Sequence, residues 1–224
     1  MPAFDHFAVI APLYARVPYS KTEVMREAAS LPVRGCLLDV GGGTGRVASA
    51  IGNLVDEIII ADISFGMLKE APLSVTSPFG DDATPLTTST LTPLSASLRP
   101  VCGGSESAAL SAGLRPVCSG SESLPFADNS FERVIMVDAL HHVIDQAHTA
   151  REMFRVLKPG GLLVIEEPDI RTFGVKLIAI AEKLLLMRSH FLAPDEIVKL
   201  FASLRVGKSS IKIADGTVWV IIEK

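Results

Sequence analysis

One segment constrains the fold of this chain more than any other: an apolar run that ends in a glycine-rich turn and continues as a helix pattern. Its sequence is Leu37-Leu38-Asp39-Val40-Gly41-Gly42-Gly43-Thr44-Gly45-Arg46-Val47-Ala48. Glycine lets the backbone turn sharply and lets a ligand approach closely, which a Cβ at Gly41, Gly43 or Gly45 would hinder. The segment therefore predicts a strand, a turn and a helix that together form one wall of a nucleotide-sized pocket.

Strand and helix patterns alternate through most of the chain, as is typical of a parallel α/β sheet. After a helical region to about residue 30, we expect strands at 36–40, 57–61, 114–118, 133–137 and 162–166, and helices at 46–54, 64–70, 145–157, 172–188 and 194–203. Lys158-Pro159-Gly160-Gly161 predicts the end of one helix, because Pro cannot continue a helix and Gly accepts a left-handed cap. Two last strands, at 205–213 and 217–222, flank Asp215-Gly216, a hairpin dipeptide. The fold class is α/β, a doubly wound sheet whose closing edge is reversed.

Size and composition predict one domain over residues 1–224, with residues 1–30 as a helical cap. A chain of 224 residues with 48% hydrophobic content can bury one full core. The formal net charge of −4, with no run of Lys or Arg, argues against nucleic acid as a partner. The longest apolar segment, 173–193, carries four charged residues, so it predicts an amphipathic helix and no membrane span.

Cysteine usage and the first residues predict a cytoplasmic location. The three cysteines, Cys36, Cys102 and Cys118, are an odd number without C-x-x-C spacing, which favours a reducing compartment over a disulfide framework or a zinc site. The first residues lack the basic residues of an export signal, and Pro12 interrupts their apolar run. No cluster of His, Asp and Glu has metal-ligand spacing, so we expect no metal.

Residues 72–113 interrupt the α/β pattern and predict a loop or disordered insert rich in Ser, Thr and Pro. The insert leads into a duplication, because residues 94–107 recur at 110–123 with differences only at Ser97/Gly113 and Gly103/Ser119. Both copies offer nearly the same side chains to the sheet edge, so they could compete for one position. Only the second copy runs on into Leu124-Pro125-Phe126, and we therefore expect it to form the third strand.

The residues around the glycine turn favour a particular ligand. Arg46 occupies the position of the third glycine in a dinucleotide fingerprint, which disfavours NAD. The carboxylate of Asp39 would repel a pyrophosphate but suits a ligand that carries an ammonium and a sulfonium, such as S-adenosylmethionine. The alternative for Asp39 is a structural role, capping the turn through backbone hydrogen bonds.

A second carboxylate follows the next predicted strand. Asp62 lies where it can accept hydrogen bonds from both hydroxyls of a ribose, although it could instead cap the next helix, a role that Ser64 can fill. Ile63 and Met67 can hold an adenine between them, and the alternative for Met67 is the core.

Five motifs in order resemble class I S-adenosylmethionine-dependent methyltransferases, especially the small-molecule group of ubiquinone and menaquinone biosynthesis. The motifs are Leu38–Gly45, Asp62–Leu68, Leu124–Phe131, Asp138–Val143 and Leu157–Gly161. The resemblance implies a Rossmann-like, three-layer αβα fold with seven strands in the order 3-2-1-4-5-7-6, the last strand antiparallel. It also implies a cofactor site at the carboxyl ends of strands 1, 2 and 4, formed by Asp39, Gly41, Gly42, Gly43, Gly45, Asp62, Ile63, Met67, Ser121 and Asp138.

The chain departs from the family at one position. The resemblance implies an Asp after the third strand that accepts from the adenine amino group, and the matching residue is Gly120. Ser121, Glu122, a backbone carbonyl or water must then supply that contact, or it is missing. Losing one partner of a buried hydrogen bond costs about 1–3 kcal/mol, so we expect cofactor binding to be weakened.

The resemblance also suggests how other residues contribute. Tyr14, in a leading helix, is expected over the methionine end of the cofactor or in an ordinary core. His141 or His142, after the fourth strand, is a candidate base for a hydroxyl acceptor, and the alternative is a helix-start or packing role. Glu166, Glu167 and Asp169 follow the fifth strand, where they could orient a polar acceptor or simply be solvated.

The sequence therefore predicts methyl transfer from S-adenosylmethionine to a small-molecule acceptor, apolar or quinone-like. Two alternatives remain open: a related domain that binds cofactor or a partner without activity, and an NAD-linked oxidoreductase.

Overall fold

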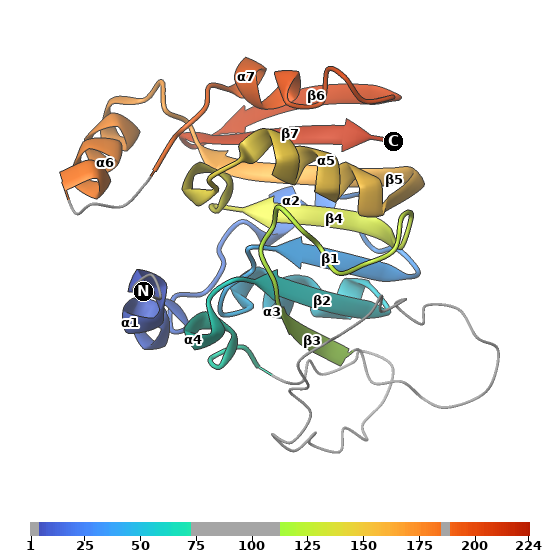
Figure 1. The fold of residues 1–224 in the computed structure, drawn as a ribbon, viewed down its shortest axis with the longest axis horizontal. Coiled ribbons are helices and arrows are strands. Elements are labelled where there is room, and N and C mark those ends of the chain that lie inside the picture. The colour runs from blue at the N-terminus through green and yellow to red at the C-terminus, as the bar shows by residue number, and fades with distance from the viewer. Residues whose placement is uncertain (1–4, 73–112, 185–188) are drawn as a thin grey trace.

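A single mixed sheet organises the part of the chain that the computed structural model describes, residues 5–72, 113–184 and 189–224. Its seven strands follow the order β3-β2-β1-β4-β5-β7-β6, which confirms the predicted topology (Figure 1). Strands β1 to β5 are parallel, whereas β7 runs antiparallel to both β5 and β6. The strands are β1 (Cys36–Val40), β2 (Glu57–Asp62), β3 (Gly113–Cys118), β4 (Phe131–Val137), β5 (Leu157–Pro168), β6 (Lys208–Ala214) and β7 (Thr217–Glu223).

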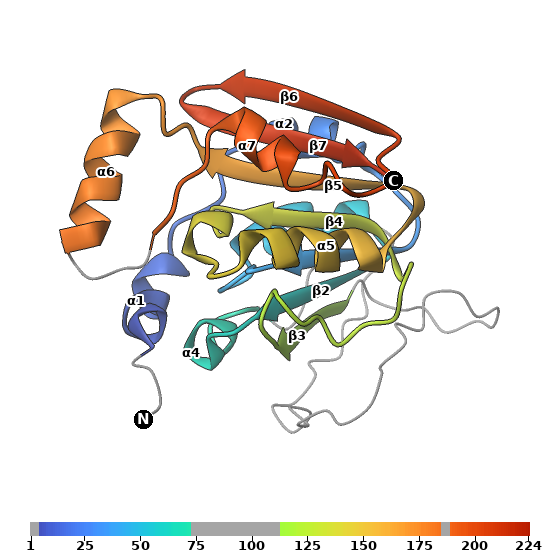
Figure 2. The same ribbon diagram turned by 45° about the horizontal axis from the view of Figure 1, so that its top comes forward.

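Helices cover both faces of the sheet and form the expected three layers. Side chains of α2 (Thr22–Ala28) and α3 (Arg46–Ile51) pack on one face, and those of α5 (Gln146–Val156) and α7 (Pro194–Lys199) pack on the other. Both α1 (His6–Tyr14) and α6 (Phe173–Leu184) lie beyond the carboxyl ends of the parallel strands (Figure 2). The remaining short helices are α4 (Phe65–Leu68), η1 (Gly52–Leu54) and η3 (Leu140–His142).

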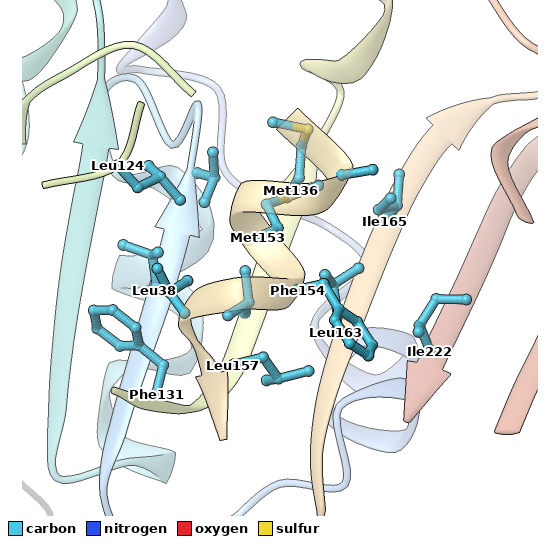
Figure 3. Close-up of a cluster of buried hydrophobic side chains, with 14 of the residues drawn as sticks. Leu38, Leu124, Phe131, Met136, Met153, Phe154, Leu157, Leu163, Ile165 and Ile222 are labelled. Atoms are coloured by element: carbon cyan, nitrogen blue, oxygen red, sulfur yellow. The ribbon is translucent and has the colours of Figure 1, made fainter. Parts of the chain in front are cut away.

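The alternation of side chains along each central strand builds two cores. Leu38, Met136 and Leu163 face α5, where they pack with Met153 and Phe154 (Figure 3). Their chain neighbours, including Leu37, Ile135 and Val164, face the opposite way and pack with residues of α2 and α3. Successive side chains of a strand point to opposite faces, so strands covered on both sides are apolar throughout.

The second copy of the duplicated segment forms the third strand, as predicted. Strand β3 pairs with β2 along its full length, from Gly113 opposite Glu57 to Cys118 opposite Asp62. The first copy, residues 94–107, and most of the predicted insert lie outside the described residues.

Three local predictions need correction. The Pro159-Gly160-Gly161 turn does not precede the fifth strand but lies within β5, where the pairing with β4 shifts between Phe131 and Arg133. The helix expected at 194–203 ends at Lys199, and the strand expected from 205 begins at Lys208.

The Asp215-Gly216 hairpin is confirmed, because both residues have the positive φ that a tight hairpin turn requires.

Candidate active site

The glycine turn after β1 is tightly packed on several sides. Gly41 and Gly45 have φ of +69° and +71°, a region that residues with a Cβ rarely adopt. A Cβ on Gly41 would lie 2.7 Å from Cβ of Ala139, and one on Gly45 would lie 2.9 Å from Cδ1 of Ile60. The sequence prediction that these positions require glycine is therefore supported by both conformation and space.

Asp39, at the end of β1, carries a buried carboxylate without a hydrogen-bond partner in the described part of the chain. Its side chain is 0% exposed, and neither Oδ1 nor Oδ2 has a hydrogen-bond partner there. Burial, reinforced by the negative charge of Asp62, raises the pKa of Asp39 to about 7. The alternative that Asp39 caps the turn is therefore wrong, and its carboxylate is left to attract a cationic or hydrogen-donating ligand.

Asp62 ties the glycine turn to the end of β2. Its Oδ2 accepts from the backbone N–H of Gly43 at 2.9 Å, and its Oδ1 accepts from that of Ser64 at 2.7 Å. Ser64 caps α4 by accepting from the N–H of Met67 at 3.2 Å, so Asp62 is not the helix cap. Each carboxylate oxygen has two acceptor positions, so one on each remains for a ligand hydroxyl. Burial raises the pKa of Asp62.

The predicted adenine contacts come together from two adjacent strands. Ile63 and Met67 line the same pocket as Gly120 and Ser121. A Cβ on Gly120 would lie 3.4 Å from Oε2 of Glu122 and 3.9 Å from Cδ1 of Ile63, so the carboxylate of Glu122 lies beside the position where the family has its acid. The hydroxyl of Ser121 is 3.0 Å from the hydroxyl of Thr149 and donates to Glu122 at 3.3 Å.

Asp138 and Tyr14 meet at the mouth of the pocket. The Tyr14 hydroxyl donates to Oδ2 of Asp138 at 3.3 Å, and the guanidinium of Arg46 lies 3.9 Å above the Tyr14 ring. Burial, followed by the charge of Asp138, raises the pKa of Tyr14 to about 12. Tyr14 lines the pocket, and its position over the methionine end of a cofactor stays a prediction.

Glu167 holds the turn that carries His141. Its Oε1 accepts from the backbone N–H groups of Ala139 at 3.1 Å and Leu140 at 2.7 Å, and its Oε2 is 2.6 Å from Nδ1 of His141. The His141 ring stacks on Phe191 with ring centroids 4.1 Å apart, at an angle of 13°. Burial, followed by the charge of His141, lowers the pKa of the adjacent His142 to about 4.

Glu166 points to the opposite face of the sheet and binds the N-terminal segment. It accepts from the Tyr19 hydroxyl at 2.6 Å and from Lys21 Nζ at 2.7 Å, and Lys21 also donates to Thr217 at 2.8 Å. Glu166, Glu167 and Asp169 are all buried, so the expectation that they could be solvated is wrong. Sequence reasoning missed Tyr19, Lys21 and Phe191, because no local pattern indicates partners so distant along the chain.

These residues enclose a pocket of about 540 Å³ at the carboxyl ends of the parallel strands. The volume is within the range of small-molecule sites, and the location is where ligands bind in open α/β sheets. Among the described residues, its charged lining consists of four carboxylates, Asp39, Asp62, Glu122 and Asp138, and one guanidinium, Arg46. The pocket therefore favours a ligand with positive charge. Every predicted cofactor residue except Gly45 lines it.

The described residues contain no group of three or more His, Cys, Asp and Glu side chains arranged to hold a metal ion. Among the described helices, none is both long enough and apolar enough to cross a membrane.

A family model described as "Methyltransferase domain" matches residues 38–165. The match begins within β1 and ends within β5. The chain belongs to this methyltransferase family. The match, together with the strand order, confirms the resemblance to class I S-adenosylmethionine-dependent methyltransferases that the motifs indicated.

Individual methyltransferases match over different lengths. The ubiquinone/menaquinone biosynthesis C-methyltransferase UbiE of Klebsiella pneumoniae is 30% identical over 134 residues, which cover 58% of this chain and 41% of that protein. The chain thus spans less than half the length of this curated relative. A SAM-dependent methyltransferase of Thermotoga maritima has the same fold, with a TM-score of 0.64, 18% identity and coverage of 97% and 98% of the two chains.

A further solved structure is a complex between the Haloferax volcanii Trm112 methyltransferase activator and a methyltransferase. The matched chain has a TM-score of 0.64 and 16% identity to this protein, with coverage of 99% of this chain and 98% of that one. At this identity the likeness establishes the fold of the methyltransferase domain.

Proposed function

We propose that this methyltransferase domain binds S-adenosylmethionine in the 540 Å³ pocket and transfers its methyl group to a small, apolar or quinone-like acceptor. The observation that carries the proposal is the charge of the pocket. Among the described residues, four carboxylates line it, those of Asp39, Asp62, Glu122 and Asp138, and Arg46 is the one cationic side chain beside them. Within the same part of the chain, the Asp39 carboxylate is buried without a hydrogen-bond partner. A ligand with a sulfonium and an ammonium matches this arrangement, whereas a dinucleotide pyrophosphate would be repelled.

The residues fit that ligand along its length. Asp62 offers acceptor positions to the ribose hydroxyls, Ile63 and Met67 offer apolar surfaces to adenine, and the glycine turn allows close approach of the backbone. Asp39 and Asp138 would face the cationic methionine end. When bound, S-adenosylmethionine supplies a methyl carbon already activated by its sulfonium. The task of the chain is to align the acceptor and exclude water.

Apolar side chains of the pocket support an apolar acceptor. They are Phe7, Ile10, Val143, Ile144 and Phe191. The name of the UbiE relative assigns that protein to ubiquinone and menaquinone biosynthesis, and this is consistent with a quinone-like acceptor here. His141 lies among these side chains and is the candidate base for an acceptor that must lose a proton.

A second candidate function is a related domain that binds cofactor or a protein partner without catalysis. Gly120 in place of the expected acid favours this alternative, since weakened adenine contacts reduce affinity. An NAD-linked oxidoreductase is disfavoured by Arg46 at the crossing position and by the acidic pocket.

Isothermal titration with S-adenosylhomocysteine and with NADH separates these functions. We expect S-adenosylhomocysteine to bind and NADH not to bind. Methyl transfer from a labelled donor to reduced 1,4-naphthoquinone and to extracted metabolites then distinguishes an enzyme from a silent binding domain. Binding of neither nucleotide would refute the proposed cofactor, and binding without any transfer would favour the non-catalytic alternative.

A further inference from the structure

We infer that exposed apolar side chains beside the pocket dock this protein on a lipid surface, from which an apolar methyl acceptor enters the pocket. The inference rests on the proposed function for the acceptor, whereas the surface itself is a feature of the described residues. We call the six side chains that carry it the apolar rim: Val9, Leu13, Ile144, Phe173, Leu177 and Ile180.

Exposed apolar side chains gather on one side of the molecule. Of the twelve large ones that are exposed in the described part of the chain, ten lie at the carboxyl ends of the parallel strands. Four are on α1 or just after it, three are on α6, and three are on the segments that follow β2 and β4. Both views place α1 and α6 on this side (Figures 1 and 2). Scattered exposed apolar residues are ordinary, but a set concentrated on one side indicates a surface that is covered when the protein acts.

Helix α6 turns its apolar stripe outward. Phe173, Leu177 and Ile180 follow the i, i+4, i+7 spacing of one helix face, which is the buried face of a helix packed on a core. All three are exposed, and Phe173 is 77% exposed. The 12 residues of α6 are also fewer than the roughly 20 that span a bilayer, so this helix is suited to lie in the plane of a lipid surface.

Helix α1 presents a second apolar stripe. Val9 and Leu13 lie one helical turn apart, and Leu13 is 70% exposed. The helix is anchored at its start, where Asp5 accepts a hydrogen bond from the Ser64 hydroxyl at 2.7 Å. The stripe is therefore held in a fixed position at the carboxyl ends of the strands.

The apolar rim is continuous with the pocket. Ile10, Ile63 and Ile144 are exposed and also line the 540 Å³ pocket. A protein partner or a second copy of the chain seated on the rim would therefore cover the opening through which an acceptor must enter. A lipid surface instead holds apolar small molecules next to the opening, so an acceptor can enter the pocket while its apolar part stays out of water. The position of the rim thus favours lipid as the occupant.

The charge near the apolar rim also fits a layer of lipid headgroups. Residues 5–17 and 173–184, which contain α1 and α6, include three basic residues, Arg16, Lys176 and Lys183, and two acidic residues, Asp5 and Glu182. Their formal charge is therefore +1, whereas that of the whole chain is −4. Basic residues beside an apolar helix face are typical of helices that lie on membranes. With so small a charge, we expect burial of the rim to supply most of the binding.

Flotation with vesicles of phosphatidylcholine and phosphatidylglycerol in equal parts tests the inference. We expect the wild type to float with the vesicles, and Leu13→Glu and Phe173→Glu each to bind at least about tenfold more weakly. Burial of a Leu or Phe side chain contributes more than the 1.4 kcal/mol that corresponds to a factor of about ten. Neither residue lines the pocket, so both variants are expected to keep their urea unfolding midpoint and their affinity for S-adenosylhomocysteine. Ile211→Glu is the matched control, because Ile211 is exposed on the edge strand β6, and we expect it to float like the wild type.

Three outcomes would overturn the inference. The first is a wild type that stays in the unbound fraction, and the second is equal flotation of Leu13→Glu, Phe173→Glu and the wild type. The third is a wild type that does not float but forms a dimer by light scattering, with both variants monomeric, which would assign the apolar rim to a second copy. A wild type that floats but does not bind S-adenosylhomocysteine would instead refute the proposed function and support the lipid surface.

Discussion

Replacing Asp39 with asparagine removes the charge that the pocket buries without a hydrogen-bond partner among the described residues. Burial and the nearby Asp62 raise the pKa of Asp39 from 3.8 to about 7 in the folded protein. The folded state therefore binds this proton more tightly than the unfolded state does. This tighter proton binding by Asp39 contributes to the free energy of unfolding. The contribution is fully present below about pH 4 and is lost as the pH rises through about 7.

The magnitude follows from the pKa difference. A pKa difference of about three units corresponds to about 4 kcal/mol in the free energy of unfolding. Roughly 3 kcal/mol of this is lost between about pH 5 and pH 8.5. The amide that Asp39→Asn introduces is neutral at every pH, so the variant escapes this loss. The free energy of unfolding of Asp39→Asn, relative to the wild type, is therefore expected to rise by about 3 kcal/mol over that interval.

Urea unfolding of both proteins at several pH values measures the difference directly. Asp215→Asn, the same substitution in the exposed hairpin turn, serves as the control for removal of one carboxylate. The proposed cofactor role adds a second expectation: S-adenosylmethionine binds the wild type more tightly as Asp39 ionises, and the Asp39→Asn variant lacks that pH dependence. A constant stability difference between Asp39→Asn and the wild type from about pH 5 to pH 8.5 would refute the reasoning.

Three further predictions concern the site and the core. Asp62→Ala is expected to abolish binding of S-adenosylhomocysteine, measured by calorimetry, because it removes the ribose acceptor and the bond to Gly43 that shapes the turn. Gly120→Asp is expected to tighten that binding by about 1–3 kcal/mol by restoring an adenine partner, whereas Gly174→Asp, which meets no neighbouring atom, serves as the control. Unchanged affinity in Gly120→Asp would mean that the third strand is misaligned with the family. Phe131→Ala is expected to cost about 3–5 kcal/mol in urea unfolding, followed by the fluorescence of the single tryptophan, because Phe131 is fully buried.

The strands were predictable because their signals are local, whereas their order in the sheet was implied by the family resemblance. The alternation of apolar runs and helix patterns predicts a parallel sheet, and right-handed crossovers restrict how such strands can be arranged. The five motifs then implied the full order, including the reversed β7. The bounds of α7 and β6 were less accurate, because the end of a helix depends on the packing of its last turn as well as on its residues.

The part of the pocket proposed to bind the cofactor was predictable because its signals are also local. Asp39, the glycines and Asp62 each lie at or just after the end of a strand, and parallel strands bring those ends to one edge of the sheet. Position along a strand therefore already placed these residues in a common pocket.

The part of the site proposed to bind the acceptor depended on contacts that no local pattern contains. Glu166 and Glu167 are adjacent in the sequence, yet the pleat of β5 sends one to Lys21 and the other to His141, 145 and 26 residues away. The sequence alone determined the strands, the glycine turn and the carboxylates of the proposed cofactor pocket, since strand ends and turn residues are set locally. Only the tertiary structure decided that Asp39 is buried without a hydrogen-bond partner among the described residues and that Glu167 orients His141. Burial and partner choice are properties of the packed fold.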